Sequence, residues 1–307
     1  MIEAKTYAVR TVSQALTAVL HDLVNVNTSP GPKETCNEIM GAQIVLRDPR
    51  YLLPYSSSRK FNYAYTVAES IWNLTNTRET AVLRRYAAIV DKFVSDQGGD
   101  TSYAKWAYGT QLNHQVKFII DELKADPLSR RAAAAIETNQ DRSPGTPPCL
   151  VSVNWQCRPC GDGLGLYQFI NMRSNDAWLG LPLDLMQFGL WGHLLAAELG
   201  IPFVQYVHQA STLHLYTRDL GNAKLWLQGT HGDAMIRPNL ELGPQALTQV
   251  LNGEVYGLIK NGLPPRPINA GAEPITAFMQ GNYRTALPGL VQLKLAGHGI
   301  GWPEAQG

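Results

Sequence analysis

Hydrophobic residues recur every three to four positions in several stretches of the chain, as they do on one face of an α-helix. This spacing predicts helices at residues 9–24, 63–76, 113–127, 180–200 and 243–253. Runs of alternating or continuous apolar residues, bounded by turn-forming segments, predict strands instead. Residues 39–53 are predicted as a strand followed by a turn, residues 129–136 as a short strand and residues 203–220 as mostly strand. Residues 151–174 are predicted as two strands around the glycine-rich turn GDGLG.

The mixture of predicted helices and strands is typical of an α+β fold in which helices pack on a large sheet. No internal repeat, low-complexity tract or linker divides the sequence, so we expect a single domain over residues 1–307. With 45% hydrophobic and 17% charged residues, the chain has enough apolar material for a packed core.

The charges of the chain nearly cancel, with 26 basic and 25 acidic residues and a formal net charge of +1. This balance argues against a protein that coats DNA or a membrane surface, although it allows a local cationic pocket. No apolar run reaches the roughly 18 residues of a membrane span. The N-terminal sequence also lacks a signal-peptide pattern, so we expect a location in the cytoplasm of a bacterium or a virus-infected host.

The four cysteines are not expected to form a disulfide framework in a cytoplasmic chain of this size. Cys157 and Cys160 make a CxxC pair, but a zinc site would need a second pair. We therefore interpret the pair as part of a structural hairpin and expect no metal. The nearby GDGLG segment is too short to hold a phosphate group.

Cys149 and three arginines are the first candidates for chemistry. Cys149 follows a proline-stiffened loop and begins a strand, where nearby arginines would lower the pKa of its thiol; a buried, inert cysteine is the alternative. Arg130, Arg131 and Arg173 adjoin apolar strands, and three converging guanidinium groups would hold a phosphate or a carboxylate. Separate surface ion pairs are the alternative for them.

Six segments in the same order resemble motifs of the thymidylate synthase family, and the resemblance covers roughly residues 29–219. Each motif alone is weak, but their order and spacing together make a specific pattern. The segments are AESIWNL, WAYGTQL, DPLSRRAAAAI, PPCL, MRSNDAWLGLPLDLMQF and LHLY.

The resemblance implies a thymidylate synthase-like fold, with a large twisted mixed sheet, and a homodimer formed through that sheet. It also implies 5,10-methylenetetrahydrofolate as the cofactor. Cys149 would be the nucleophile that adds to C6 of a pyrimidine nucleotide. This addition makes C5 a carbon nucleophile, which takes up the methylene carbon of the folate.

The same resemblance assigns the residues that would bind the nucleotide. Arg173 and Ser174 would hold the 5′-phosphate from the same subunit, whereas Arg130 and Arg131 would reach the partner subunit's phosphate in trans. Lys33 stands in the loop where the family has a mobile phosphate-binding arginine. His214 and Tyr216 fall on the motif that contacts the sugar hydroxyl groups.

Other positions would act on the base or on the folate. Glu69 matches a carboxylate that organises water and moves protons, and Tyr108 matches a tyrosine that helps to remove the C5 proton. Asp176 falls on a folate-contacting position, and Glu69 and Trp106 are also expected at the cofactor. Val90 aligns where synthases have a tryptophan beside the folate.

Asp184 is the most informative departure from the family pattern, because thymidylate synthases have asparagine there. Cytosine presents an amino donor at C4 and an acceptor at N3, and a carboxyl group can match both. The same exchange marks the cytidylate hydroxymethylases of this family. An aspartate tolerated in a uracil enzyme is the alternative.

Further departures bear on the product. Leu150 and Met172 replace polar residues of the family, and the small Val90 would admit water to the C5-methylene intermediate. We therefore expect water addition, which gives 5-hydroxymethyl-(d)CMP and tetrahydrofolate, rather than reductive methylation.

The sequence thus predicts a folate-dependent 5-hydroxymethyltransferase that acts on a cytidylate, with dCMP preferred. Three alternatives stay open. These are a CMP 5-hydroxymethylase of nucleoside-antibiotic biosynthesis, a dCMP 5-methyltransferase, and an inactive nucleotide- or RNA-binding protein on the same fold.

Overall fold

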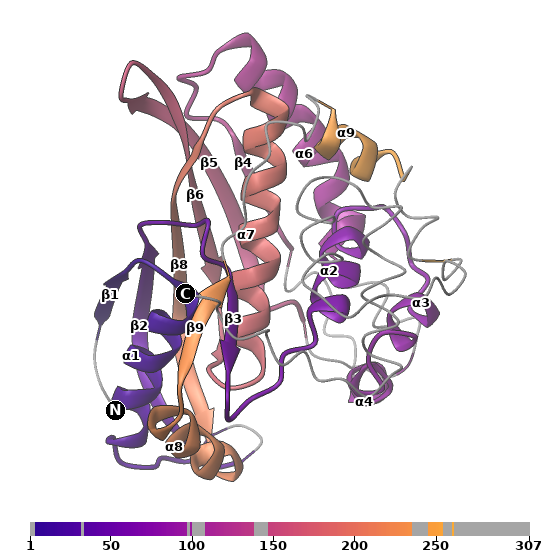
Figure 1. Cartoon of the computed structure of the whole chain (residues 1–307). Coiled ribbons are helices and arrows are strands. Elements are labelled where there is room, and N and C mark those ends of the chain that lie inside the picture. Colours follow the sequence, from indigo (N-terminus) through magenta and orange to yellow (C-terminus); the bar gives the residue numbers. More distant parts are fainter. Residues whose placement is uncertain are drawn as a thin grey trace, which may run out of the picture. The chain divides into compact units, whose positions relative to one another are not determined.

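The computed structural model describes residues 4–31, 34–96, 99, 108–137, 147–234, 245–253 and 260 (Figure 1). By its internal contacts the chain divides into two compact units. The first comprises Met1–Lys60, Cys149–Gly192 and Ile201–Ile236, and the second comprises Phe61–Pro148, His193–Gly200 and Arg237–Gly307.

The first unit is built on a mixed sheet with the strand order β1–β2–β8–β6–β5, and the short strand β7 also pairs with β8. Strands β1 and β2 are parallel, as are β6 and β8, whereas β2–β8 and β5–β6 are antiparallel. The bounds are β1 (Lys5–Val9), β2 (Cys36–Leu46), β5 (Leu150–Cys160), β6 (Gly163–Met172), β7 (Asn175–Asp176) and β8 (Phe203–Tyr216).

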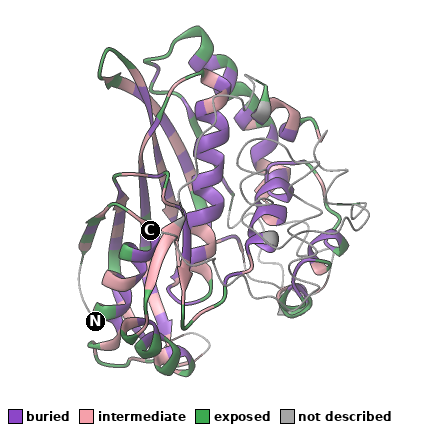
Figure 2. Ribbon diagram, in the orientation of Figure 1, coloured by how far each residue is buried: buried purple, intermediate pink, exposed green. Residues whose placement is uncertain are grey.

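Helices α1 (Val12–Val24) and α7 (Gly180–Leu199) have bounds close to the predicted ones, and α7, which continues into the second unit after Gly192, is buried along most of its length (Figure 2). Helix α8 (Leu220–Gln228) was not predicted. A two-stranded sheet of β3 (Leu53–Ser56) and β9 (His231–Ala234) completes this unit, with the 3₁₀ turn η1 (Thr217–Asp219) after β8. The mixed sheet with packed helices confirms the predicted fold class.

Strands β5 and β6 form the hairpin that the sequence predicts around GDGLG. Gly161 begins the turn with a φ of 58°, a left-handed conformation that favours glycine. Cys157 is buried within β5, and neither it nor Cys160 forms a disulfide. In the described ranges no group of three or more histidine, cysteine or acidic residues could hold a metal ion. The predicted hairpin is confirmed, and the CxxC pair lies at the end of its first strand.

Helix α7 packs closely on the sheet of its unit at a glycine. A Cβ atom on Gly192 would lie 2.4 Å from Phe203 Cζ and 3.0 Å from Gln168 Oε1, so only glycine allows this approach. Gln168 is fully buried, accepts from Trp155 Nε1 at 2.7 Å and donates to the Phe188 carbonyl oxygen at 2.8 Å. A satisfied polar contact therefore fixes the helix on the sheet.

The second unit contains a helical layer around α6 (Tyr108–Ala125). Asn113 of α6 donates to the carbonyl oxygens of Leu74 and Leu251, at 2.8 Å each, and so joins the segments that follow α2 and end α9. Gln115 bonds both backbone groups of Ala135. The other elements are α2 (Tyr63–Trp72), α3 (Ala81–Arg84), α4 (Ile89–Asp96), β4 (Ala133–Ala135) and α9 (Ala246–Leu251).

Several boundaries differ from the prediction, and two of them concern candidate site residues. Helix α6 begins at Tyr108, five residues before the predicted start at 113. Gly109 lets this first turn approach the Thr75 carbonyl oxygen, which a Cβ atom would meet at 2.0 Å. The predicted strand at 203–220 ends at Tyr216, where the chain turns into α8. Among the described helices, none has the length and hydropathy that a membrane span requires.

Gly192→Ala should destabilise the protein by about 1–3 kcal/mol, because the new methyl group overlaps the Phe203 ring. Gly221→Ala is the matched control, since a Cβ atom at this position in α8 meets nothing within 4 Å. It should stabilise α8 by up to about 1 kcal/mol. Urea denaturation measures both, and equal effects of the two substitutions would contradict the close packing of α7.

Candidate active site

The candidate site in the first unit lies where β7 meets the end of β8. Asp176 is paired with His214 in the parallel register of these strands, and the Ala177 N–H donates to the His214 carbonyl oxygen at 2.7 Å. Asp176 Oδ1 accepts from the backbone N–H groups of Trp178 (2.8 Å) and Leu179 (3.0 Å), which shapes the turn into α7. The structure thus brings Asp176 and His214, predicted from separate motifs, together.

Cys149 stands just before β5, at the edge of the same unit. The Arg173 N–H donates to the Cys149 carbonyl oxygen at 2.8 Å, so the candidate nucleophile is bound through its backbone to the Arg173–Ser174 segment after β6. Cys149 is half-buried and not in a disulfide, and Arg173 and Ser174 are also half-buried. The bond brings the backbones of the two candidates together, and the catalytic role of Cys149 stays a prediction.

Aromatic and charged groups surround Tyr216 at the end of β8. Its ring lies 4.8 Å from the His214 ring at an angle of 72°, and the Arg218 guanidinium lies 4.3 Å from its centre. Burial raises the pKa of Tyr216, and the negative charges of Asp176, Cys36 and Cys149 raise it further. The tyrosine is therefore a neutral hydroxyl group that can donate or accept a hydrogen bond.

Burial has opposite effects on the pKa values of the paired side chains in this region. It raises the pKa of Asp176, although the N–H groups of Leu179 and Trp178 act against this rise. It lowers the pKa of His214, although the charges of Asp176 and Glu38 oppose this change. Desolvation thus favours the uncharged form of each group.

Asp184 lies in the first turns of α7 and is half-buried. Its Oδ2 accepts a hydrogen bond from Asn175 Nδ2 at 2.7 Å. A Cβ atom on Gly180 would lie 3.1 Å from that nitrogen and 3.4 Å from Asp184 Oδ2, so the glycine leaves room for the bond. The base-recognition candidate is therefore held by a residue of the same motif segment, nine positions earlier in the chain.

Arg59 is a candidate that the sequence reasoning missed. Its guanidinium lies 4.1 Å from the centre of the Trp178 ring, a cation–π contact. Burial lowers the pKa of Arg59 to about 10, and the charges of Asp176 and Asp219 oppose this decrease. Arg59 precedes the first motif, AESIWNL, by nine residues in a serine-rich segment, and no periodicity or motif marks it.

The second unit carries Glu69, Tyr108 and Val90. Glu69 accepts from the Tyr65 hydroxyl at 2.5 Å within α2, and burial raises the pKa of its carboxyl group to about 7. Tyr108 begins α6. Val90 is fully buried in α4 and presents no surface to a ligand in this structure, so its predicted place beside the folate stays a prediction.

The adjacent arginines in this unit differ in their contacts. Arg131 donates from Nε and Nη2 to the two carboxylate oxygens of Glu122, at 2.9 and 3.0 Å, so part of its guanidinium is already engaged. The side chain of Arg130 is exposed. Lys33 and Trp106 lie outside the described residues, so their predicted roles are not addressed by the structure.

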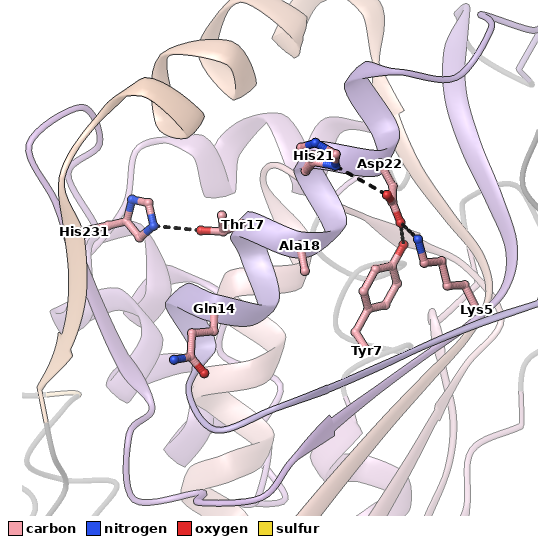
Figure 3. Close-up of a pocket in the computed structure, with 8 residues that line it drawn as sticks. All are labelled: Lys5, Tyr7, Gln14, Thr17, Ala18, His21, Asp22 and His231. Carbon is pink, nitrogen blue, oxygen red and sulfur yellow. Dashed lines mark hydrogen bonds and ion pairs between the residues drawn. The ribbon is translucent and has the colours of Figure 1, made fainter.

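A separate hollow of about 440 Å³ lies beside α1 in the first unit (Figure 3). On one side Asp22 pairs with Lys5 and accepts from the Tyr7 hydroxyl at 2.7 Å, and on the other Thr17 bonds His231 at 2.8 Å. These polar groups bond one another and tether β1 and β9 to α1. We therefore assign the hollow a structural role.

Comparisons with known proteins agree with the motifs. Residues 24–253 match the family model described as thymidylate synthase. The chain is similar to thymidylate synthase 1 of Bacillus spizizenii, with 24% identity over 208 residues, which covers 63% of this chain and 70% of that protein. A thymidylate synthase of Bacillus phage phi3T has the same identity over 207 residues, with the same coverage.

Glu69→Gln should change how stability depends on pH. The raised pKa means that the folded protein holds a proton on Glu69 between pH 4.5 and about 7, where the unfolded chain has lost it. Relative to the variant, the wild-type protein should lose stability as pH rises through this window, by up to about 3 kcal/mol, and stay constant above it.

Glu137→Gln is the control, because Glu137 is exposed in the same unit. Denaturant titrations at several pH values give the difference curves. A wild-type protein that gains stability relative to Glu69→Gln between pH 4.5 and 7, or a flat difference, would contradict the buried carboxyl group.

Proposed function

Because the chain belongs to the thymidylate synthase family, we propose that it transfers a one-carbon unit from 5,10-methylenetetrahydrofolate to C5 of a cytidylate, with dCMP preferred. Family membership supports an enzyme of pyrimidine-nucleotide biosynthesis that transfers one carbon. The cytidylate substrate and the hydroxymethyl product go beyond that and rest on the residues of this chain.

Asp184 carries the choice of substrate. It occupies the asparagine position of the family motif, and Asn175 orients it by a 2.7 Å hydrogen bond. A carboxyl group can accept from the 4-amino group of cytosine and, when protonated, can donate to N3. An amide at this point matches the carbonyl and N3–H of uracil instead. The exchange therefore favours cytosine.

Residues of the first unit are chemically suited to a folate. The Asp176 carboxyl group can accept from the donor edge of a pterin ring. Arg59, stacked on Trp178, supplies a positive charge for the carboxylate tail of a folate. When bound, the cofactor supplies a carbon at the oxidation level of formaldehyde.

The steps on the nucleotide balance without an external oxidant or reductant. The Cys149 thiolate adds to C6, so C5 becomes nucleophilic and forms the bond to the transferred carbon. Loss of the C5 proton to a base, together with cleavage of the bond between the transferred carbon and the folate nitrogen, would leave an exocyclic methylene group on C5 and release tetrahydrofolate. Water then adds to that carbon, and the C6–sulfur bond breaks to release Cys149. The products are the 5-hydroxymethyl nucleotide and tetrahydrofolate.

The remaining residues take the roles that the resemblance implies. Arg173 and Ser174 bind the 5′-phosphate, and His214 and Tyr216 bind sugar hydroxyl groups. Glu69, with a pKa of about 7, can exchange protons near neutral pH.

Assembly supplies the rest of the phosphate site in this proposal. A homodimer provides Arg130 to the partner's site, since its side chain is exposed. Arg131 can bind the same phosphate through Nη1, the guanidinium nitrogen that Glu122 does not engage.

Asp184→Asn should shift substrate preference from dCMP toward dUMP. The ratio of kcat/KM for dCMP to that for dUMP should fall about ten- to a hundredfold, because an amide matches the uracil edge. Tritium release from the two 5-³H nucleotides measures both rates. Asp162→Asn is the matched control, since Asp162 is exposed in the β5–β6 turn. An unchanged ratio in Asp184→Asn would remove Asp184 from base recognition.

A further inference from the structure

A chain of hydrogen-bonded side chains runs from the core of the first unit to Asp184. The Tyr206 hydroxyl lies 2.9 Å from His208 Nδ1, and His208 Nε2 lies 2.9 Å from Asn175 Oδ1. Asn175 Nδ2 then donates to Asp184 Oδ2. Tyr206, His208 and Asn175 are only 0%, 1% and 4% exposed, so water does not compete for the first two bonds.

The chemistry of these groups sets the direction of each hydrogen bond. Asn175 donates from its NH₂ group to Asp184 Oδ2, so its carbonyl oxygen faces His208. That oxygen only accepts, so the imidazole proton is on Nε2. Burial lowers the pKa of His208 to about 3, so the ring is neutral and Nδ1 accepts from Tyr206. Every donor therefore points toward Asp184.

The opposite direction is unfavourable at the buried end. It would require Asp184 to donate from Oδ2 and His208 to carry its proton on Nδ1. The Tyr206 hydroxyl would then have to donate elsewhere, yet His208 is its one hydrogen-bond partner in the part of the chain that the structure describes. A buried hydroxyl proton without an acceptor is costly. Tyr206 therefore fixes the direction of every hydrogen bond in the array formed by Tyr206, His208, Asn175 and Asp184.

The direction of the array limits what Asp184 can offer a base. Because Oδ2 is an acceptor for Asn175, any proton that Asp184 carries lies on Oδ1. The protonated carboxyl group thus presents a donor on Oδ1 and an acceptor on Oδ2, and never the reverse. Cytosine and uracil present opposite orders at C4 and N3, so a fixed order matches one base and rejects the other.

We propose that Tyr206, His208 and Asn175 are positioning residues that set the order of donor and acceptor on Asp184 and thereby select the base. The proposal rests on the proposed function, because it takes Asp184 as the group that meets the base. Without the array, the proton could lie on either oxygen, and the same carboxyl group would accept both pyrimidines.

Tyr206→Phe removes the hydroxyl that orients His208 and leaves the groups of Asn175 and Asp184 in place. We expect the ratio of kcat/KM for dCMP to that for dUMP to fall about tenfold, the effect of one hydrogen bond. Tyr7→Phe is the matched control. Its hydroxyl donates to Asp22 at 2.7 Å, outside the array, so the ratio should not change.

The outcomes separate this proposal from the proposed function. If the wild-type enzyme prefers dCMP and Tyr206→Phe leaves the dCMP to dUMP ratio of kcat/KM unchanged, the role of the array in base selection is wrong and the proposed function stands. A wild-type enzyme that prefers dUMP would overturn the proposed substrate. In that case a ratio that relaxes in Tyr206→Phe would still support the array, and an unchanged ratio would overturn it too.

The tautomer of His208 can be measured in the unmodified protein, so the test does not depend on a variant that folds. In ¹⁵N-edited NMR spectra, with His208→Gln used for assignment, the imidazole should be neutral at pH 6 and protonated on Nε2. A proton on Nδ1, or a doubly protonated ring at this pH, would overturn the proposed direction.

Discussion

The backbone pairing of β8 is the interaction on which the rest of the site depends. This strand is hydrogen-bonded to β2 along one edge and to β6 and then β7 along the other. Side chains alternate along a strand, so its register determines which residues reach the site. A slip of one residue would turn His208 and His214 to the other face of the sheet and separate both from β7.

Strand β7 shows how a very short element can control chemistry. It consists of Asn175 and Asp176, and its pairing with β8 sets Asp176 opposite His214, while the Asn175 side chain bonds His208. The two carboxyl groups nearby, Asp176 and Asp184, then meet different donors. Asp176 accepts from backbone N–H groups, and Asp184 accepts from a side-chain amide. Distinct partners allow neighbouring carboxyl groups to serve different ligands, here the folate and the base in our proposal.

Much of this arrangement could be predicted from sequence, but not all of it. Helices α1, α2 and α7 and the β5–β6 hairpin follow from local periodicity and turn residues, which need no knowledge of distant partners. The candidates Cys149, Arg173, Asp176 and His214 follow from motifs. The array that ends at Asp184 could not be found in this way, because Tyr206 and His208 look like ordinary strand residues until the register with β6 and β7 is known.

Arg59 was missed for a related reason. Its importance comes from the ring of Trp178, far away in the sequence, and from the charges of Asp176 and Asp219. For Val90 the resemblance gives a place beside the folate, and the structure adds only that the side chain is buried in α4, so this role stays a prediction.

The most direct test of the proposed function is to identify the product. The purified protein would be incubated with 5,10-methylenetetrahydrofolate and an equimolar mixture of CMP, dCMP and dUMP, and the nucleotides would be analysed by mass spectrometry. The gain of one CH₂O on dCMP is the predicted result, and the same gain on CMP would keep the reaction but change the sugar. A gain of CH₂ on a cytidylate would contradict water addition. Product from dUMP alone would contradict the role given to Asp184 and with it the proposed substrate.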